Sequence, residues 1–260
     1  GSEMCIRDRD TANIERAYDL GVADYMRRPF ERVMVLRQVQ NVLMLYAKQK
    51  RLTRLVTDQV YEKEHNSVLM ISILSHVVEF RNSESGLHVL HIRTLTDLLL
   101  HRLVPKTDRY QLDESDIARI STASALHDIG KIGIPESILK KAGKLTNEEY
   151  EIMKSHVEKS IEMIHYLPNM NYVIPAVVSH HERYDGKGYP RGIKGEEIPF
   201  LGRILAVCDS FDAMISKRAY KEPLSVEYAM GELEKNKGTQ FDPEVADAFI
   251  ELIKEGKVPL

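Results

Sequence analysis

The sequence predicts an all-α protein in which a long N-terminal helix leads into a helical bundle. Apolar residues recur at steps of three and four almost throughout the chain from Val68 onward, which is the spacing of buried helix faces. The alternation that is typical of strands is nearly absent from the same stretch. A run without proline or glycine over residues 31–82 predicts the long helix. At 260 residues, the chain can bury one large core.

Residues 1–10 are expected to be a leader outside the fold, because Gly1-Ser2 is typical of the scar of tag removal. The polar N-terminus predicts no signal peptide, and no apolar run approaches the roughly 20 residues that span a bilayer. The two cysteines, Cys5 and Cys208, form no CxxC pair, which suits a reducing compartment. We therefore predict a cytoplasmic protein with no membrane partner.

Residues 11–46 are predicted to form a helix, a short strand and the start of a second helix. The amphipathic segment 14–20 ends at Gly21, a residue type that often follows a helix C-terminus. The strand candidate, 22–26, is followed by Arg28-Pro29-Phe30. This stretch resembles the last third of a response-regulator receiver domain, whose final strand ends in Lys-Pro-Phe or a near variant. The alternative is an arbitrary helical lead-in. The phospho-accepting part of a receiver is not in this sequence, so we expect no phosphorylation control.

Residues 31–66 are predicted to be a connector helix that pairs with a second copy of the chain as a parallel coiled coil. The alternative is a helix that packs along its own domain. A charged stretch at 48–51 interrupts the apolar seam and argues against a strong zipper. The seam starts with residues at steps of three and four: Leu36, Val39, Leu43 and Tyr46.

Residues 67–260 are predicted to form the bundle. Thr146 and Glu149 have the spacing of a capping box, and Asp242-Pro243 has the residue types of an N-cap followed by a first helical residue. The predicted helices cover 117–126, 148–164, 173–180, 204–215, 226–234 and 243–254.

The charge balance argues against nucleic acid as a partner. The formal net charge is -3 and the isoelectric point is about 6.4, so the chain lacks the excess of basic residues that DNA-binding proteins carry.

Histidines next to carboxylates mark a candidate metal centre. His127 and Asp128 diverge by about 100° on a helix, and both could not be buried in an apolar core at low cost. A carboxylate beside a histidine can bridge two ions. Glu84 and His88 are four residues apart, a spacing that puts them on one helix face. Lys131, four residues after His127, could hold a phosphate over the same site.

A second adjacent pair, His180-His181, is suited to two ions of one cluster. His156 and Asp209 lie within otherwise amphipathic or apolar stretches. Nitrogen and oxygen ligands without thiolates suit iron, manganese, zinc or nickel, and such ions activate water against phosphoesters. Arg218 and Lys221 are further cation candidates, with a solvated surface as their alternative role.

Three segments carry the most specific motifs of the chain. They are His127-Asp128-Ile129-Gly130-Lys131, the stretch from His180-His181-Glu182 to Gly188-Tyr189-Pro190, and Arg203-Ile204-Leu205-Ala206-Val207-Cys208-Asp209. They resemble the HD-GYP family, cyclic di-GMP phosphodiesterases of the HD superfamily. The resemblance covers about residues 67–260. It implies an all-α HD-superfamily bundle and a centre of two or three divalent ions, with iron as the first choice.

The resemblance also implies residue roles. Asp128 and Lys131 are implied to be catalytic, and Glu84 is the ligand that separates members with three ions from those with two. The implied substrate contacts are Lys131, Gly186, Gly188, Tyr189, Pro190, Arg218 and Lys221. The implied metal ligands are Glu84, His88, His127, Asp128, His156, His180, His181 and Asp209.

Two positions depart from the family pattern. His91 stands where many members have an arginine three residues after the Glu-x-x-x-His motif, and Ala219 stands where Arg-Pro-Tyr is common. Neither is an implied ligand, so they bear on substrate preference or rate.

The predicted function is hydrolysis of cyclic di-GMP to linear pGpG, with GMP as a further product. One alternative keeps the enzyme and changes the substrate to 3',3'-cGAMP or another phosphoester. Another is a low-activity module that binds a cyclic dinucleotide or a diguanylate cyclase and signals by contact. The intact ligand set and Lys131 argue against that module.

Overall fold

The structure is a computed structural model that describes residues 15, 19, 31–82, 87–106, 111–167, 170–217 and 222–259. The predicted strand at 22–26 lies outside the described residues. Of the predicted helix over 14–20, only Glu15 and Asp19 are described, and both are helical. None of the described helices has the length and apolarity that a bilayer-spanning segment needs.

The chain divides into two compact units, residues 1–64 and 65–260. The predicted long helix is confirmed as α2 (Arg32–Asn82), which begins in the first unit and ends in the second. The first unit's part of α2 exposes its apolar residues, including Val39, Leu43 and Tyr46. The second unit's part buries Ile71 and Val78 in the core of that unit.

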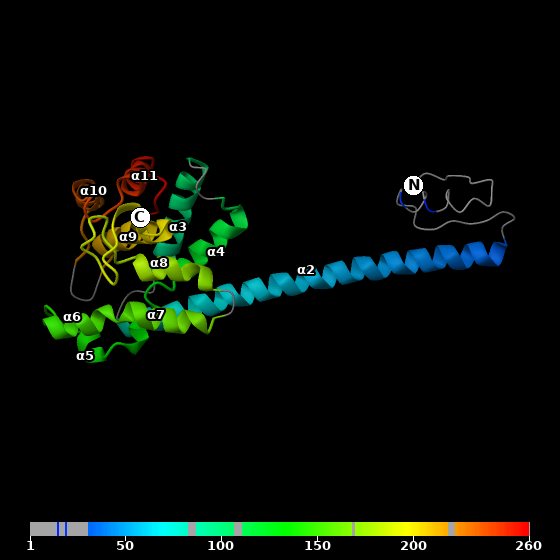
Figure 1. Cartoon of the computed structure of the whole chain (residues 1–260), viewed down its shortest axis with the longest axis horizontal. Helices are drawn as coiled ribbons and strands as arrows, with labels where there is room; N and C mark the ends of the chain where they lie inside the picture. Colours follow the sequence, from blue (N-terminus) through cyan, green and yellow to red (C-terminus); the bar gives the residue numbers. More distant parts are fainter. Residues whose placement is uncertain are drawn as a thin grey trace. The chain divides into compact units, whose positions relative to one another are not determined.

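The second unit is an all-α bundle, and its described residues form no strand, only an isolated bridge between Lys237 and Phe241 (Figure 1). The helices of this unit after α2 are α3 (His88–Leu103), η1 (Val104–Lys106), α4 (Glu114–Ser124), η2 (Ile129–Gly133), α5 (Glu136–Leu139), α6 (Asn147–Lys154), α7 (His156–His165), η3 (Asn171–Val173), α8 (Ile174–Ser179), η4 (Gly195–Glu197), α9 (Phe200–Ile215), α10 (Val226–Lys235) and α11 (Pro243–Lys254). α3 packs against α4, α9 and α11, and α8 packs against both α7 and α9.

Local signals fix several helix starts as predicted. The Thr146 hydroxyl accepts from the Glu149 amide at 3.2 Å, and the Glu149 carboxylate accepts from the Thr146 amide at 2.7 Å, which completes the capping box of α6. Asp242 caps α11, and Pro243 is its first residue. These side chains satisfy amides that have no partner within the helix.

Two helix predictions are wrong in detail. The predicted helix over 148–164 is broken at Ser155 into α6 and α7. His127 and Asp128 do not continue the helix predicted over 117–126, because α4 ends at Ser124 and residues 125–128 form a turn. Both breaks lie where η2 meets α7. A Cβ atom on Gly130 would lie only 2.0 Å from the His156 carbonyl oxygen, so the backbones approach as closely as a glycine allows.

Candidate metal centre

The turn that carries His127 and Asp128 is joined to the start of α7. The Gly130 amide donates to the Ser160 hydroxyl at 2.8 Å, and that hydroxyl donates to the His127 carbonyl at 3.3 Å. Because Ser160 lies one turn after His156 on α7, these bonds bring His156 beside Asp128. The break between α6 and α7 at Ser155, which the sequence did not predict, therefore assembles this part of the site.

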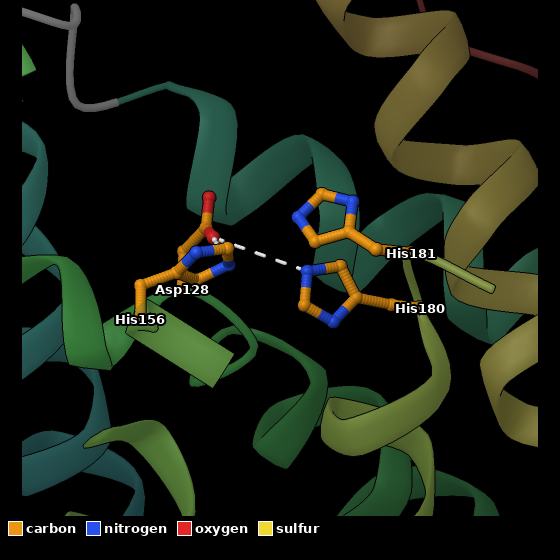
Figure 2. A group of neighbouring side chains, drawn as sticks. All are labelled: Asp128, His156, His180 and His181. Atoms are coloured by element: carbon orange, nitrogen blue, oxygen red, sulfur yellow. Dashed lines mark ion pairs between the residues drawn. The ribbon is translucent and has the colours of Figure 1, made fainter. Parts of the chain in front are cut away.

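The two carboxylate oxygens of Asp128 face two separate groups of histidines. Oδ1 lies 3.3 Å from Nε2 of His156 and 4.0 Å from Nε2 of His180, and Figure 2 shows these rings and His181 converging on the carboxylate. Oδ2 lies 3.4 Å from Nε2 of His127. The side chains form two ligand groups that share this residue: Asp128, His156, His180 and His181; and His88, His127 and Asp128.

Three of the rings are aimed by backbone carbonyls of their own segments. Nδ1 of His127 lies 2.9 Å from the Ser124 carbonyl, Nδ1 of His156 lies 2.7 Å from the carbonyl of Met153, and Nδ1 of His180 lies 2.6 Å from that of Val177. A carbonyl oxygen only accepts, so each Nδ1 must donate, and each neutral ring keeps its lone pair on Nε2.

The Nε2 atoms of His127, His156 and His180 are buried and have no hydrogen-bond partner among the described residues. Buried nitrogen atoms without partners are costly unless something absent from the protein chain binds them. Ring nitrogens that converge on carboxylates, with the opposite nitrogen bonded to the protein, fit a divalent metal ion.

The charged side chains of the centre shift one another's pKa values. Burial disfavours the charged form of Asp128, but the ammonium of Lys131, 2.5 Å from Oδ2, and the nearby His127 hold the pKa of this carboxyl well below its usual range. Burial also disfavours protonation of His127, but the charges of Asp128 and Asp209 outweigh it and raise its pKa to about 9. Burial lowers the pKa of His180 to about 3 and lowers the pKa values of His156 and His181.

Asp212 is a candidate site residue that the sequence did not indicate. Its buried carboxylate accepts from Nδ1 of His88 and from Nδ1 of His91, each at 2.6 Å, and from the Ser216 hydroxyl at 2.9 Å. Burial opposes its ionisation, but these hydrogen bonds hold its pKa below the usual value. Nε2 of His88 then faces Asp209 at 3.7 Å. The spacing of Asp212 three residues after Asp209 on one helix was the signal that could have found it.

We expect Asp212→Asn to weaken metal binding by about 10- to 100-fold, since loss of a carboxylate that orients a ligand histidine typically costs this much. Titration of the metal-free protein with Mn²⁺ measures the effect. Ser216→Ala removes one donor to the same carboxylate and leaves the His88 contact in place, so it should weaken metal binding far less. Equal affinities for Asp212→Asn and the unmodified protein would contradict the orienting role.

Some of the remaining predicted site residues are described by the structure, and others are not. Asp209 on α9 lies beside the second ligand group, with Oδ1 also 3.9 Å from Nε2 of His127. Tyr189 stacks on the His181 ring at a centroid distance of 4.7 Å, and Pro190 follows it through a cis peptide bond. Glu84, Arg218 and Lys221 lie outside the described residues.

The glycines of the loop before Tyr189 have conformational roles. Gly186 has a φ of +81°, which side chains rarely adopt, and a Cβ on Gly188 would lie 2.3 Å from the Arg183 amide nitrogen. The loop is tied to the segment before α11, because the amides of Tyr184 and Asp185 donate to carbonyls of residues 240 and 239 at 3.2 and 2.8 Å. The Tyr189 amide also donates to the His181 carbonyl at 3.2 Å, which holds the loop beside His181.

Known proteins resemble this chain in sequence and in fold. The family described as "HD domain" matches residues 93–245, more than half of the chain. The chain belongs to the HD-domain family. Its HD relatives include a cyclic di-GMP phosphodiesterase of Thermotoga maritima, 34% identical over 95% of this chain and 69% of that protein. The cyclic di-GMP phosphodiesterase response regulator RpfG of Xanthomonas campestris is 34% identical over 91% of this chain and 63% of that protein. These relatives support the HD-GYP branch.

A third HD relative is named a 3'3'-cGAMP-specific phosphodiesterase 2, from Vibrio cholerae; it is 39% identical over 68% of this chain and 33% of its own length. The chain therefore spans between a third and about two thirds of these relatives. A solved V. cholerae cyclic GMP-AMP phosphodiesterase superposes with a TM-score of 0.57 at 19% identity, over 74% of this chain and 49% of that one. This likeness confirms the all-α HD fold. HD membership and the two histidine groups together support binding of divalent metal ions.

Proposed function

We propose that this HD-domain chain hydrolyses cyclic di-GMP to linear pGpG, and that GMP is the product of a second hydrolysis. The observation that carries the proposal is the Asp128 carboxylate, whose two oxygens each face a different histidine group. Such a bridging carboxylate suits a pair of ions. The names of the relatives from T. maritima and X. campestris support the substrate.

Divalent ions at such a centre supply a nucleophile from water at neutral pH and neutralise charge on phosphoryl oxygens. The protein's own contribution comes from fixed groups. The backbone carbonyls of Ser124, Met153 and Val177 orient three histidine rings. The Nε2 lone pairs of these rings therefore point into the centre. Lys131 adds a positive charge next to Asp128, where it can stabilise negative charge that develops on the phosphoryl group.

We propose His88, His127, Asp128, His156, His180, His181 and Asp209 as the ligands. Glu84 is proposed to complete the binding site of a third ion. Iron is the proposed metal, with manganese, zinc or nickel as alternatives. Arg218 and Lys221 are proposed to contact phosphate, and Gly186, Gly188, Tyr189 and Pro190 to border the guanine. Anaerobic purification with metal analysis tests the metal, and an unchanged metal count in Glu84→Ala would remove the third ion.

Turnover of cyclic di-GMP by the metal-loaded protein, with product analysis, tests the activity. The V. cholerae relative named for 3'3'-cGAMP makes that dinucleotide the second candidate substrate, so both are assayed side by side. A protein that holds metal and binds a cyclic dinucleotide without hydrolysing it would support the alternative of a binding module, including one that contacts a diguanylate cyclase. A protein with neither metal nor turnover would contradict the enzyme.

Metal loading should release protons. His127 needs its Nε2 lone pair to bind an ion, yet its raised pKa of about 9 keeps the metal-free ring protonated at neutral pH. We therefore expect about one proton from His127 per centre at pH 7, and about half of one at pH 9. His88 adds to the release, because burial lowers its pKa but the hydrogen bond to Asp212 and the charges of Asp209 and Asp212 together outweigh burial and raise it. Apparent metal affinity accordingly falls as the pH falls below 9.

Calorimetric titration with Mn²⁺ under argon, in buffers of different ionisation enthalpy, counts these protons. The lowered pKa values of His156, His180 and His181 mean that these rings are already neutral and release none. Proton release that is absent at pH 7 would contradict the assignment of His127 as a protonated ligand.

We also propose that α2 pairs with a second copy of the chain over residues 31–66. Leu36, Val39, Leu43 and Tyr46 occupy alternating positions of a heptad seam, and all four are exposed within the described chain. Sedimentation equilibrium should find a dimer that Leu43→Glu weakens. A monomer at micromolar concentration would contradict the pairing.

The remaining proposals concern the division of the chain into segments and its location in the cell. We propose that residues 11–46 are a receiver-like remnant, which the response-regulator name of the X. campestris relative supports. We further propose a cytoplasmic location, residues 1–10 as a leader, and residues 67–260 as the phosphodiesterase domain.

A further inference from the structure

Three aromatic rings lead outward from the metal centre. Tyr189 stacks on His181 with an interplanar angle of 28°, and Tyr150 meets the Tyr189 ring edge to face at 6.2 Å and 78°. The rings come from the end of α8, the loop that follows it, and α6. They form a continuous aromatic wall of His181, Tyr189 and Tyr150 whose inner end is a candidate metal ligand.

The outer end of the aromatic wall is open. Tyr150 is 46% exposed, and its ring is not part of the hydrophobic core of the described residues. An aromatic ring left half exposed beside a metal centre offers a face or an edge to a planar ligand.

A cation accompanies the wall. The Lys154 ammonium lies 5.3 Å from the Tyr150 ring centroid and 5.8 Å from that of Tyr189. It also pairs with Glu151 at 2.6 Å, but its side chain keeps about a quarter of its surface open to solvent. Tyr150 and Lys154 lie one helical turn apart on α6, so both point to the same side of that helix.

We propose that Tyr150 and Lys154 form, with Tyr189, the subsite that receives the purine base of the nucleotide whose phosphate is cleaved. The inference rests on the proposed function and adds two residues of α6 to it. Purines stack on aromatic side chains. Lysine donates to guanine through O6 and N7. Because the aromatic wall begins at His181, a candidate metal ligand, we expect the base next to a phosphodiester held at the centre to meet this wall.

The test compares two substrates for each variant. Cyclic di-GMP carries two purine bases, whereas bis(p-nitrophenyl) phosphate has neither purine nor ribose, and its smaller nitrophenyl rings lack the O6 and N7 acceptors of guanine. We expect Tyr150→Leu to raise KM for cyclic di-GMP roughly tenfold, in the range of one lost base–aromatic stack, with kcat nearly unchanged. Lys154→Met should raise the same KM severalfold. kcat/KM for bis(p-nitrophenyl) phosphate should stay within about twofold in Lys154→Met, and in Tyr150→Leu it should fall by less than kcat/KM for cyclic di-GMP, because the smaller ring has less surface to stack.

Two control variants separate stacking from packing. Tyr150→Phe keeps the ring and should keep the KM of the unmodified protein. Tyr228→Leu removes a tyrosine of similar exposure on α10 and should change the KM of neither substrate. Metal content, measured on every variant, should equal that of the unmodified protein.

Each outcome decides the inference. An unchanged KM for cyclic di-GMP in Tyr150→Leu overturns it, and so does an equal loss on both substrates or a lower metal content, because then Tyr150 only supports the His181 ring. If the unmodified protein hydrolyses bis(p-nitrophenyl) phosphate but no cyclic dinucleotide, the proposed function fails first, and the purine subsite fails with it.

Discussion

Asp128→Ala is expected to yield a folded protein with neither a metal pair nor measurable turnover. Among the residues that the structure describes, Asp128 alone belongs to both ligand groups, so its loss removes a ligand from each. The loss of an orienting partner alone costs up to about 100-fold in metal affinity or activity, and the loss of a shared ligand should exceed that. Metal analysis after anaerobic purification and hydrolysis of cyclic di-GMP measure the two effects.

Asp58→Ala, which alters an exposed carboxylate on α2, is the matched control and should retain both properties. Circular dichroism of the Asp128→Ala protein checks its helix content. A variant that keeps a full complement of metal and turns over within about tenfold of the unmodified protein would contradict the bridging role.

The largest effect on stability is expected from Asp242→Ala. Asp242 is buried, caps the N-terminus of α11 and forms an ion pair with the buried Arg203 of α9. Asp242→Ala breaks this buried pair and removes the cap of α11 together, and breaking a buried pair typically costs about 3–5 kcal/mol. α9 also carries Asp209 and Asp212, so the same substitution should loosen one side of the metal centre.

Urea denaturation followed by circular dichroism measures this free energy of unfolding. Asp247→Ala on the same helix is the control, because Asp247 pairs with Lys237 at 2.5 Å while remaining more than half exposed. An exposed pair of this kind contributes about 0–1 kcal/mol. Similar midpoints for the two variants would contradict a structural role for the buried pair.

Most of the helices could be predicted because their determinants are local. The caps at Thr146 and Asp242 and the proline-free run of α2 act within a few residues of the chain. The break at Ser155 and the turn at 125–128 depend instead on contact between η2 and α7, where Gly130 meets the backbone of His156. Such a contact joins segments about 26 residues apart, and periodicity carries no signal for it.

The residues of the candidate site could be selected from the sequence because motif residues can be recognised without their geometry, and their roles stay predictions. Of the eight implied ligands, the structure places His88, His127, Asp128, His156, His180, His181 and Asp209 around one centre. Asp212 and Tyr150 were missed because their roles come from neighbours on other helices, namely His88 for Asp212 and Tyr189 for Tyr150.

The carbonyls of Ser124, Met153 and Val177 have a consequence for how the protein handles its ions. Each carbonyl lies three residues before the ring that it orients, so each ring is held by its own short piece of backbone. These hydrogen bonds involve no ion, so we expect the exchange of one ion for another to leave the helices folded. The metal found in a given preparation should then follow the supply of ions during expression, and a single purified batch could be stripped and reloaded to compare iron, manganese, zinc and nickel in an unchanged scaffold.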